Sequence, residues 1–185
     1  MITLVTGGAR SGKSSFAEKL CREAGGRVGY IAAAVVTDDD MRARVAAHRA
    51  QRPADWVTYE CYRDFGALEA DADFAGCSML LLDCVTTLTT NHMMDSGLDF
   101  DTCALDGVWA VEARVREELD VLLALARRHG KRLVLVTNEV GQGIVPAFRM
   151  GSLFRDIAGR INVHLASQAD EVYCMISGLP LRLKG

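Results

Sequence analysis

The stretch Gly7-Gly8-Ala9-Arg10-Ser11-Gly12-Lys13-Ser14 matches the pattern G-x-x-x-x-G-K-[ST] and follows the apolar run of residues 2–6. The order is strand, glycine loop, helix. In such a loop, backbone N–H groups surround phosphate oxygens, and the next helix offers its positive end to the same anion. Lys13 would then reach the β- and γ-phosphates, and Ser14 would hold Mg²⁺. The flanking strand and helix argue against a chance match in a surface turn.

The composition indicates one globular domain over residues 1–185, because half of the residues are hydrophobic, enough for a sizeable core. The formal net charge of −3 comes from 21 basic and 24 acidic residues, which argues against a nucleic-acid-binding surface. The six cysteines form neither a C-x-x-C pair nor a zinc-like cluster, which predicts reduced thiols. Without a recognisable signal peptide or membrane-length apolar run, we expect a cytoplasmic protein with no membrane insertion.

Hydrophobic patterning predicts strands that alternate with helices. Strands are expected at residues 2–6, 28–36, 56–60, 79–83, 133–137 and 171–176. Helices are expected at residues 16–24, 38–53, 63–73, 108–129 and 154–165. The alternation predicts an α/β fold of the P-loop NTPase type, a three-layer fold with a mainly parallel sheet and helices on both faces. A tight turn at residues 177–180 predicts a short antiparallel C-terminal edge strand at residues 181–184.

Asp83 ends the apolar run of residues 79–82 and is a candidate Walker B carboxylate. In phosphate-loop enzymes this residue lies at the carboxyl end of a strand beside the glycine loop and binds the metal, usually through water. The alternative is that Asp83 caps the helix that the next residues allow. The glycine loop in the same chain favours the metal role.

The segment Asn138-Glu139-Val140-Gly141-Gln142-Gly143 follows the predicted strand at residues 133–137. Open α/β sheets bind ligands at the carboxyl ends of their strands, so this segment is a candidate ligand loop. A turn or a helix start explains the same residues equally well.

His48 lies on the apolar face of the predicted helix at residues 38–53 and is followed by Arg49 and Arg52. A partly buried histidine bonded to a backbone carbonyl is the simpler interpretation. The other is a nucleophile, because a neutral imidazole can attack phosphorus while the two arginines neutralise the phosphates. The residues alone leave both open, and they assign no role to His92.

Five motifs make the chain resemble the bifunctional adenosylcobinamide kinase / adenosylcobinamide-phosphate guanylyltransferases of cobalamin biosynthesis. They are T-G-G-A-R-S-G-K-S at residues 6–14, A-x-H-R-x-x-R-P-x-x-W at 46–56, D-C-x-T-x-x-x-T-N at 83–91, N-E-V-G-x-G-I-V-P at 138–146 and F-R-D-x-x-G-R-x-N at 154–162. The resemblance covers essentially the whole chain, and the order of the motifs is specific.

The resemblance implies two reactions at one nucleotide site. ATP or GTP phosphorylates the aminopropanol hydroxyl of adenosylcobinamide. GTP then transfers GMP to a histidine with loss of pyrophosphate, and the phosphorylated corrinoid accepts it to give adenosylcobinamide-GDP. By position in its motif that histidine is His48, and Lys13 is the catalytic residue on the triphosphate. A P-loop small-molecule kinase without a covalent histidine is the alternative, and a regulatory nucleotide-binding module is a third.

The resemblance also implies a set of nucleotide contacts, a metal site and a homotrimer. The nucleotide contacts are Gly7, Gly8, Ala9, Arg10, Ser11, Gly12, Lys13, Ser14, Ala32, Ala33, Ala34, Arg49, Ala50, Gln51, Arg52, Glu60 and Asp83. Ser14 and Asp83 would hold Mg²⁺. Glu60 could accept a hydrogen bond from guanine or ribose, although a solvent-facing glutamate is equally plausible. The partners are the corrinoid and the nucleotides.

Three residues depart from the pattern of this family. Leu88, Ser152 and Val163 stand where tryptophan, arginine and glutamine are frequent. These changes leave the nucleotide chemistry intact and concern corrinoid contacts or subunit packing.

Overall fold

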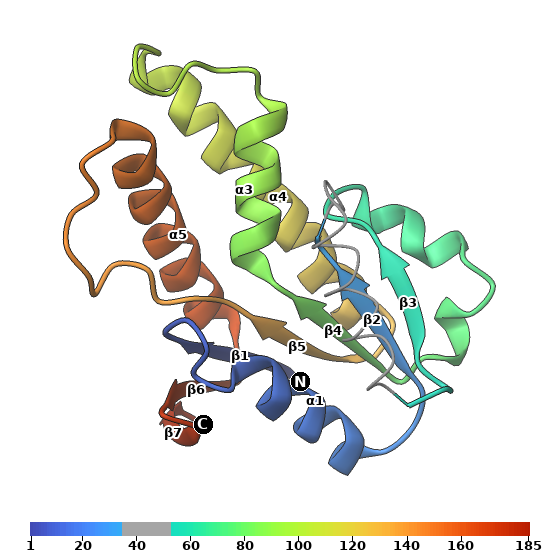
Figure 1. Cartoon of the computed structure of the whole chain (residues 1–185). Helices are drawn as coiled ribbons and strands as arrows, with labels where there is room; N and C mark the ends of the chain where they lie inside the picture. The colour runs from blue at the N-terminus through green and yellow to red at the C-terminus, as the bar shows by residue number, and fades with distance from the viewer. Residues whose placement is uncertain (35–52) are drawn as a thin grey trace.

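A computed structural model of the chain describes residues 1–34 and 53–185. Among these residues, seven strands form one sheet in the order β3-β2-β4-β5-β1-β6-β7 (Figure 1). The strands are β1 (Ile2–Gly7), β2 (Val28–Ala32), β3 (Val57–Glu60), β4 (Met79–Asp83), β5 (Arg132–Val136), β6 (Glu171–Ile176) and β7 (Leu179–Lys184). Neighbouring strands are parallel except β6 and β7, which are antiparallel. The predicted mainly parallel sheet with an antiparallel C-terminal edge is confirmed.

The central strands are buried on both faces, in agreement with their largely apolar sequences. Side chains alternate along a strand, so neighbouring residues enter opposite layers of the core. In β4, Leu80 and Leu82 join the larger hydrophobic cluster, whereas Met79 and Leu81 join the smaller one. Two cores separated by one sheet require helices on both faces.

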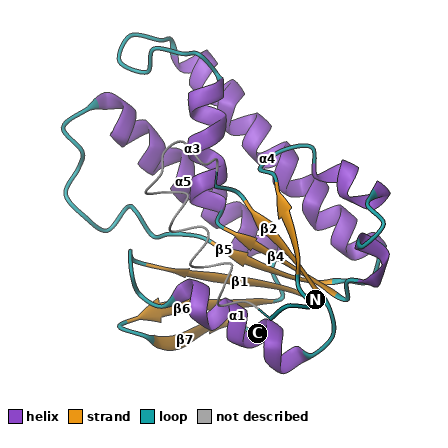
Figure 2. Cartoon of the chain, turned by 45° about the vertical axis from the view of Figure 1, so that its right-hand side comes forward, coloured by secondary structure: helices purple, strands orange, loops and turns teal. Residues whose placement is uncertain are grey.

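The helices cover the two faces unequally (Figure 2). Helix α1 (Lys13–Ala24) packs Ala17 and Cys21 into the smaller cluster. The helices α3 (Val85–Asp95), α4 (Leu105–Arg128) and α5 (Arg149–Gln168) pack into the larger one on the other face. The predicted α/β fold of the P-loop NTPase type, in three layers, is therefore confirmed.

Several predicted elements differ from the structure. The helix expected at residues 63–73 is replaced by two 3-10 turns, η1 (Phe65–Ala70) and η2 (Phe74–Gly76). Asp71 between them is extended, and its carboxylate accepts a hydrogen bond from the N–H of Asp73 at 2.9 Å, which stops a continuous helix. Helix α5 also begins at Arg149, earlier than expected, and most of the predicted helix at residues 38–53 lies outside the described residues.

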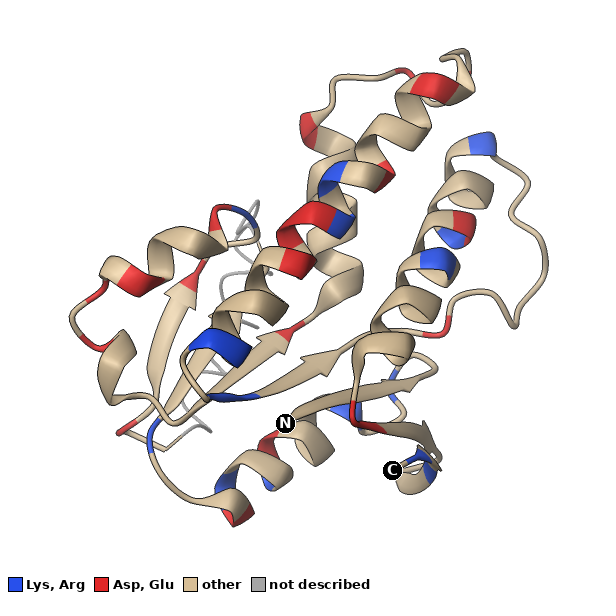
Figure 3. Cartoon of the chain, turned by 180° about the vertical axis from the view of Figure 1, so that it is seen from behind, with Lys and Arg blue, Asp and Glu red and all other residues tan. Residues whose placement is uncertain are grey.

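The six cysteines are free thiols, in agreement with their predicted reduced state. Within the described parts of the chain, no helix combines the length and the hydropathy that a membrane crossing requires. Acidic and basic residues are interspersed along α4 and α5 (Figure 3).

Candidate active site

The glycine loop joins β1 to α1 through backbone conformations that favour glycine. Gly7 has φ 144° and Gly12 has φ 91°. A Cβ atom on Gly7 would lie 2.5 Å from the carbonyl oxygen of Met175, so only glycine fits between the loop and β6. Gly12 is the N-cap of α1, which places the unpaired N–H groups of the first helical turn under the loop. This arrangement suits an anion.

Lys13 places a buried cation at the loop. Its side chain is 7% exposed, and Nζ donates to the carbonyl oxygen of Gly8 at 2.6 Å. Burial lowers the pKa of Lys13, while the neighbouring Cys84 and Asp83 oppose that change. A phosphate in the loop would add further negative charge beside Nζ and stabilise the ammonium form.

Ser11 carries an unsatisfied hydroxyl in the same loop. Its Oγ is buried and has no hydrogen-bond partner among the described residues. The backbone around it is fixed, because the N–H of Gly178 donates to the Ser11 carbonyl oxygen at 3.0 Å. A buried hydroxyl without a partner is costly, and a phosphate oxygen would satisfy it. The residues present therefore fit a triphosphate.

Asp83 ends β4 at the carboxyl edge of the sheet. Its carboxylate Oδ2 accepts a hydrogen bond from the hydroxyl of Tyr30 at 3.0 Å. The helix-capping alternative does not hold, because the N-cap of α3 is Cys84 and no side-chain capping hydrogen bond is formed there. Asp83 is therefore available at the position that a Walker B carboxylate occupies.

Ser14 and Asp83, the residues predicted to hold Mg²⁺, fit that ion only if phosphate oxygens of the nucleotide supply further ligands. No group of three or more His, Cys, Asp or Glu side chains in the described part of the chain is arranged to hold a metal. Mg²⁺ commonly keeps several waters and takes one or two protein oxygens together with substrate phosphates. The Ser14 hydroxyl on the first turn of α1 and the Asp83 carboxylate match that oxygen donor set.

Strand register places three predicted nucleotide contacts side by side. Ala32 pairs with Glu60 on one side and with Asp83 on the other. Glu60 is exposed, and it lines a cavity of about 620 Å³ together with Ala32 and Ala34. Ala33 is buried, and its carbonyl oxygen accepts a hydrogen bond from Asn91 Nδ2 at 2.7 Å, which ties this strand end to α3.

Glu60 lies far from the glycine loop across the sheet. Four strand spacings separate β3 from β1, which amounts to roughly 19 Å. A nucleotide with its phosphates in the loop and its base at Glu60 would have to lie across the carboxyl ends of those strands. The other predicted contacts, His48, Arg49, Ala50, Gln51 and Arg52, lie outside the described residues.

A polar network beside the loop joins residues that lie far apart in the sequence. Thr6 Oγ1 donates to Glu139 Oε1 at 2.6 Å, and Asn162 Nδ2 lies 3.3 Å from the same oxygen. Thr137 Oγ1 donates to Asn162 Oδ1 at 2.7 Å. The sequence predicts Asn138 and Glu139 in a possible ligand loop, and the strand order brings them beside the glycine loop.

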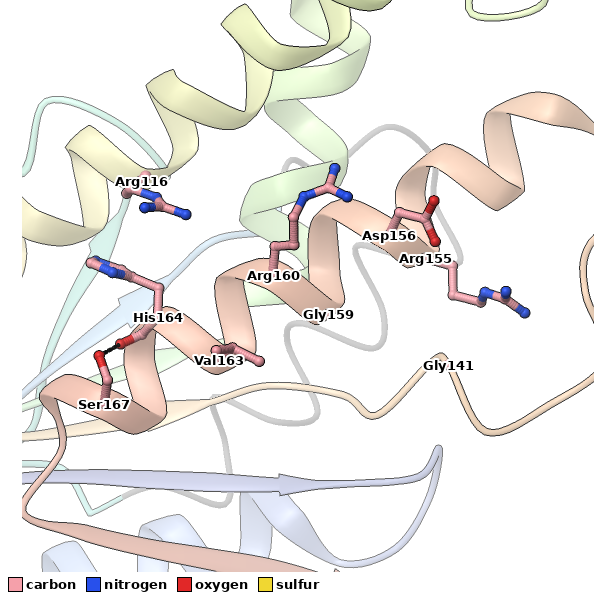
Figure 4. A pocket seen from close by; sticks show the side chains of 9 residues that line it. All are labelled: Arg116, Gly141, Arg155, Asp156, Gly159, Arg160, Val163, His164 and Ser167. Carbon is pink, nitrogen blue, oxygen red and sulfur yellow. Dashed lines mark hydrogen bonds between the residues drawn. The ribbon is translucent and has the colours of Figure 1, made fainter.

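A second cavity, of about 590 Å³, follows the outer side of α5 (Figure 4). Two of its basic side chains, Arg160 and His164, have close acidic partners. Arg160 forms a bidentate pair with Glu112, with Nε 2.9 Å from both carboxylate oxygens, and this hydrogen bonding raises the pKa of Arg160. His164 Nε2 lies 2.6 Å from Asp120 Oδ1. The cavity is therefore less favourable for an anion than its arginines suggest.

The structure also places four residues to which the sequence assigned no defined role, namely His92, Leu88, Ser152 and Val163. His92 Nε2 lies 3.2 Å from the carbonyl oxygen of Tyr62, whose ring also packs edge-on against the imidazole. Leu88 is fully buried in the larger core, so the departure at this position concerns packing. Ser152 is half-buried on α5, whereas Val163 is exposed and lines the cavity of Figure 4.

Comparison with known proteins identifies close relatives over the whole chain. Residues 3–183 match the family described as cobinamide kinase / cobinamide phosphate guanyltransferase. A protein from Salmonella typhimurium named bifunctional adenosylcobalamin biosynthesis protein CobU is 46% identical over 184 residues, covering 100% of both chains. The protein of the same name from Escherichia coli is 45% identical with the same coverage. One from Pseudomonas aeruginosa, named CobP, is 38% identical and covers 100% of this chain and 98% of the relative.

Solved structures with a similar arrangement are much more distant in sequence. A KaiC-like protein from Pyrococcus horikoshii is 15% identical, with a TM-score of 0.47 over 94% of this chain and 69% of that one. The RadB recombinase is 14% identical, with a TM-score of 0.48 over 94% and 73% of the two chains.

Proposed function

The chain belongs to the cobinamide kinase / cobinamide phosphate guanyltransferase family and is an enzyme of this bifunctional class, and from this premise we propose that it transfers GMP through a covalent intermediate on His48. One domain, residues 1–185, would carry both reactions. The nucleotide would bind at the glycine loop during phosphorylation of the corrinoid hydroxyl.

The observation that supports the kinase site is the convergence of three groups on the loop. These are the buried ammonium of Lys13, the unsatisfied hydroxyl of Ser11 and the unpaired N–H groups that begin α1. They would hold the β- and γ-phosphates and stabilise charge on the transferring phosphoryl group, which supplies most of the catalysis in such reactions. Ser14 and Asp83 would hold Mg²⁺, which neutralises phosphate charge when bound.

In the proposed GMP transfer, an imidazole nitrogen of His48 attacks the α-phosphorus of GTP. The P–N bond forms while the bond to the α,β-bridging oxygen breaks, and pyrophosphate leaves with that electron pair. A phosphate oxygen of the phosphorylated corrinoid then attacks the same phosphorus and breaks the P–N bond. The covalent step divides one displacement between two large substrates into two smaller ones.

Further proposed contacts surround the GTP. Arg49 and Arg52 would neutralise its phosphates, and Ala50 and Gln51 complete that segment. Ala32, Ala33, Ala34 and Glu60 would contact the guanine or ribose, and the exposed carboxylate of Glu60 beside a cavity supports this role.

We also expect the family's homotrimer. Leu179, Leu181 and Leu183 of the edge strand β7 are 72%, 51% and 60% exposed. An apolar edge strand is prone to pairing with another chain, so a neighbouring subunit could cover it. Light scattering during size-exclusion chromatography measures the number of subunits, and a monomeric mass would contradict this expectation.

Labelling tests the covalent step directly. GTP labelled at the α-phosphate is mixed with the protein, which is then denatured, and acid-labile label is expected on the polypeptide. His48→Ala should carry no label while it retains much of the hydroxyl phosphorylation. Label that survives His48→Ala would place GMP on another residue and contradict the role of His48. Absence of label from the unchanged protein would support the rival P-loop kinase without a covalent histidine.

A further inference from the structure

Strand β5 ends between Asp83, the candidate Walker B carboxylate, and the glycine loop. Its last residue, Val136, pairs with Asp83 on β4 and with Val5 on β1. Adjacent strands lie about 4.8 Å apart, so the chain that leaves β5 emerges between the candidate Walker B carboxylate and the glycine loop. Residues 137–139 therefore lie at the carboxyl edge where a γ-phosphate and its attacking group would meet.

Glu139 is fixed to the glycine loop at both its backbone and its side chain. Its N–H donates to the carbonyl oxygen of Gly7 at 3.0 Å. Its Oε1 accepts from Thr6 Oγ1 at 2.6 Å and from Asn162 Nδ2 at 3.3 Å. No hydrogen bond to Oε2 is found within residues 1–34 and 53–185. One carboxylate oxygen is thus anchored, and the other can take a further donor.

Asn162 is in turn held by its own partners. Its side chain is buried on α5, where its Oδ1 accepts from Thr137 Oγ1 at 2.7 Å. This bond fixes the amide so that Nδ2 donates to the carbonyl oxygen of Asn138 at 3.1 Å and to Glu139. Buried polar groups are energetically costly when they lack hydrogen-bond partners, and they are held rigidly when all their partners are present. The network therefore gives the Glu139 carboxylate a fixed orientation.

We infer that Glu139 is a catalytic residue of the kinase reaction and accepts the proton of the corrinoid hydroxyl. The hydroxyl oxygen forms a bond to the γ-phosphorus while the bond from that phosphorus to the β,γ-bridging oxygen breaks. The nucleoside diphosphate leaves with the electron pair, and the proton moves to Oε2 of Glu139 and then to solvent. The inference rests on the proposed position of the triphosphate in the glycine loop.

A general base that accepts an alcohol proton is needed in only one of the two reactions. Phosphorylation has an alcohol as its nucleophile, and removing the alcohol proton at the right moment accelerates the attack. GMP transfer has an imidazole nitrogen and then a phosphate oxygen as nucleophiles, and neither carries an alcohol proton. Glu139 is therefore required for the first reaction and dispensable for the second.

The test compares the two reactions in the full-length Glu139→Gln variant, which keeps the size and the Oε1 acceptor of the side chain. With ATP and cobinamide, we expect kcat to fall by about 10²–10⁴-fold, the usual contribution of a general base, with little change in KM. Labelling with α-labelled GTP should proceed as in the unchanged protein.

Two further variants sharpen the result. Thr6→Val removes the shorter bond to Oε1 but keeps the carboxylate, so we expect a kinase loss smaller than that of Glu139→Gln. Glu171→Gln is the matched control, because Glu171 begins β6 at the opposite edge of the sheet and pairs with Arg182 at 2.9 Å. This control should leave both reactions unchanged.

Two results would overturn the role of Glu139. One is a kinase kcat that stays unchanged in Glu139→Gln. The other is an equal loss of phosphorylation and labelling together with a lowered melting temperature, which would show that Glu139 only supports the structure of the glycine loop. Lys13→Ala separates this failure from that of the proposed site: if Lys13→Ala still phosphorylates cobinamide normally, the triphosphate does not bind in the glycine loop.

Discussion

Gly7 joins a buried strand to a phosphate loop, and the surrounding atoms leave no room for a side chain. A Cβ atom there would lie 2.5 Å from the Met175 carbonyl oxygen and 2.9 Å from Ser11 Oγ. Its φ of 144° is also one that L side chains rarely adopt. Strain of this type costs about 1–3 kcal/mol before any atom is displaced.

Gly7→Ala should therefore lower the free energy of unfolding by at least about 1–3 kcal/mol, because it combines backbone strain with a clash. Gly8→Ala is the matched control, since no atom lies within 4 Å of its added Cβ. That variant should change stability by no more than about 0.5 kcal/mol. Urea unfolding monitored by circular dichroism measures both values. Equal stability of the two variants would contradict the close approach of the loop to β6.

At the scale of single elements, the positions of the strands were predictable, whereas the helices were less so and the one expected at residues 63–73 was wrong. Continuous apolar runs such as residues 79–82 have few alternatives to a buried strand. Helix α3 is rich in threonine, a β-branched residue of low helix propensity, so its sequence allowed a helix only as an alternative. In the folded chain, Thr89 and Thr90 donate to the carbonyl oxygens of Val85 and Thr86, and Leu88 packs in the core. Tertiary packing outweighs the local preference.

Helix α4 packs against the core through one apolar face, and a single substitution on that face can test this arrangement. Leu122 is 0% exposed, whereas its neighbour Val121 is 43% exposed. Leu122→Ala should destabilise the protein by about 2–5 kcal/mol, because it removes buried methyl groups and leaves a cavity. Val121→Ala is the control, and its effect should stay within about 0.5 kcal/mol. Thermal and urea unfolding measure both, and a similar cost for the two would contradict the assigned face.

At the scale of the whole molecule, the site depends on strand order, which periodicity does not reveal. The sequence identified the glycine loop and Asp83 separately, each by a local motif. Their spatial relation follows from β5, which is inserted between β4 and β1 although it comes later in the chain. For the same reason, Glu139 could not be distinguished from an ordinary turn residue. Its partners Thr6 and Asn162 are 133 and 23 residues away in sequence.

Strand order also separates Glu60 from the glycine loop, and this separation predicts different effects on the two reactions. The two features lie at opposite parts of the carboxyl edge, roughly 19 Å apart over four strand spacings. If Glu60 accepts hydrogen bonds from guanine, Glu60→Gln removes an ionised acceptor, and losing a charged hydrogen bond costs about 1.5–3 kcal/mol. That cost corresponds to a rise of about 10–150-fold in the KM for GTP during GMP transfer.

The ATP-driven kinase reaction should be nearly unchanged in Glu60→Gln, because adenine has no matching donor pattern and the phosphate loop is distant. Initial rates of the two reactions, measured with the nucleotide varied at saturating corrinoid, separate the effects. Glu69→Gln is a suitable control, since Glu69 is an exposed carboxylate of η1 that pairs with Arg128. Equal impairment of both reactions by Glu60→Gln would mean that ATP and GTP lie in one pose across the sheet edge. A change confined to GMP transfer would place guanine recognition at β3, apart from the loop that holds the transferred phosphoryl group.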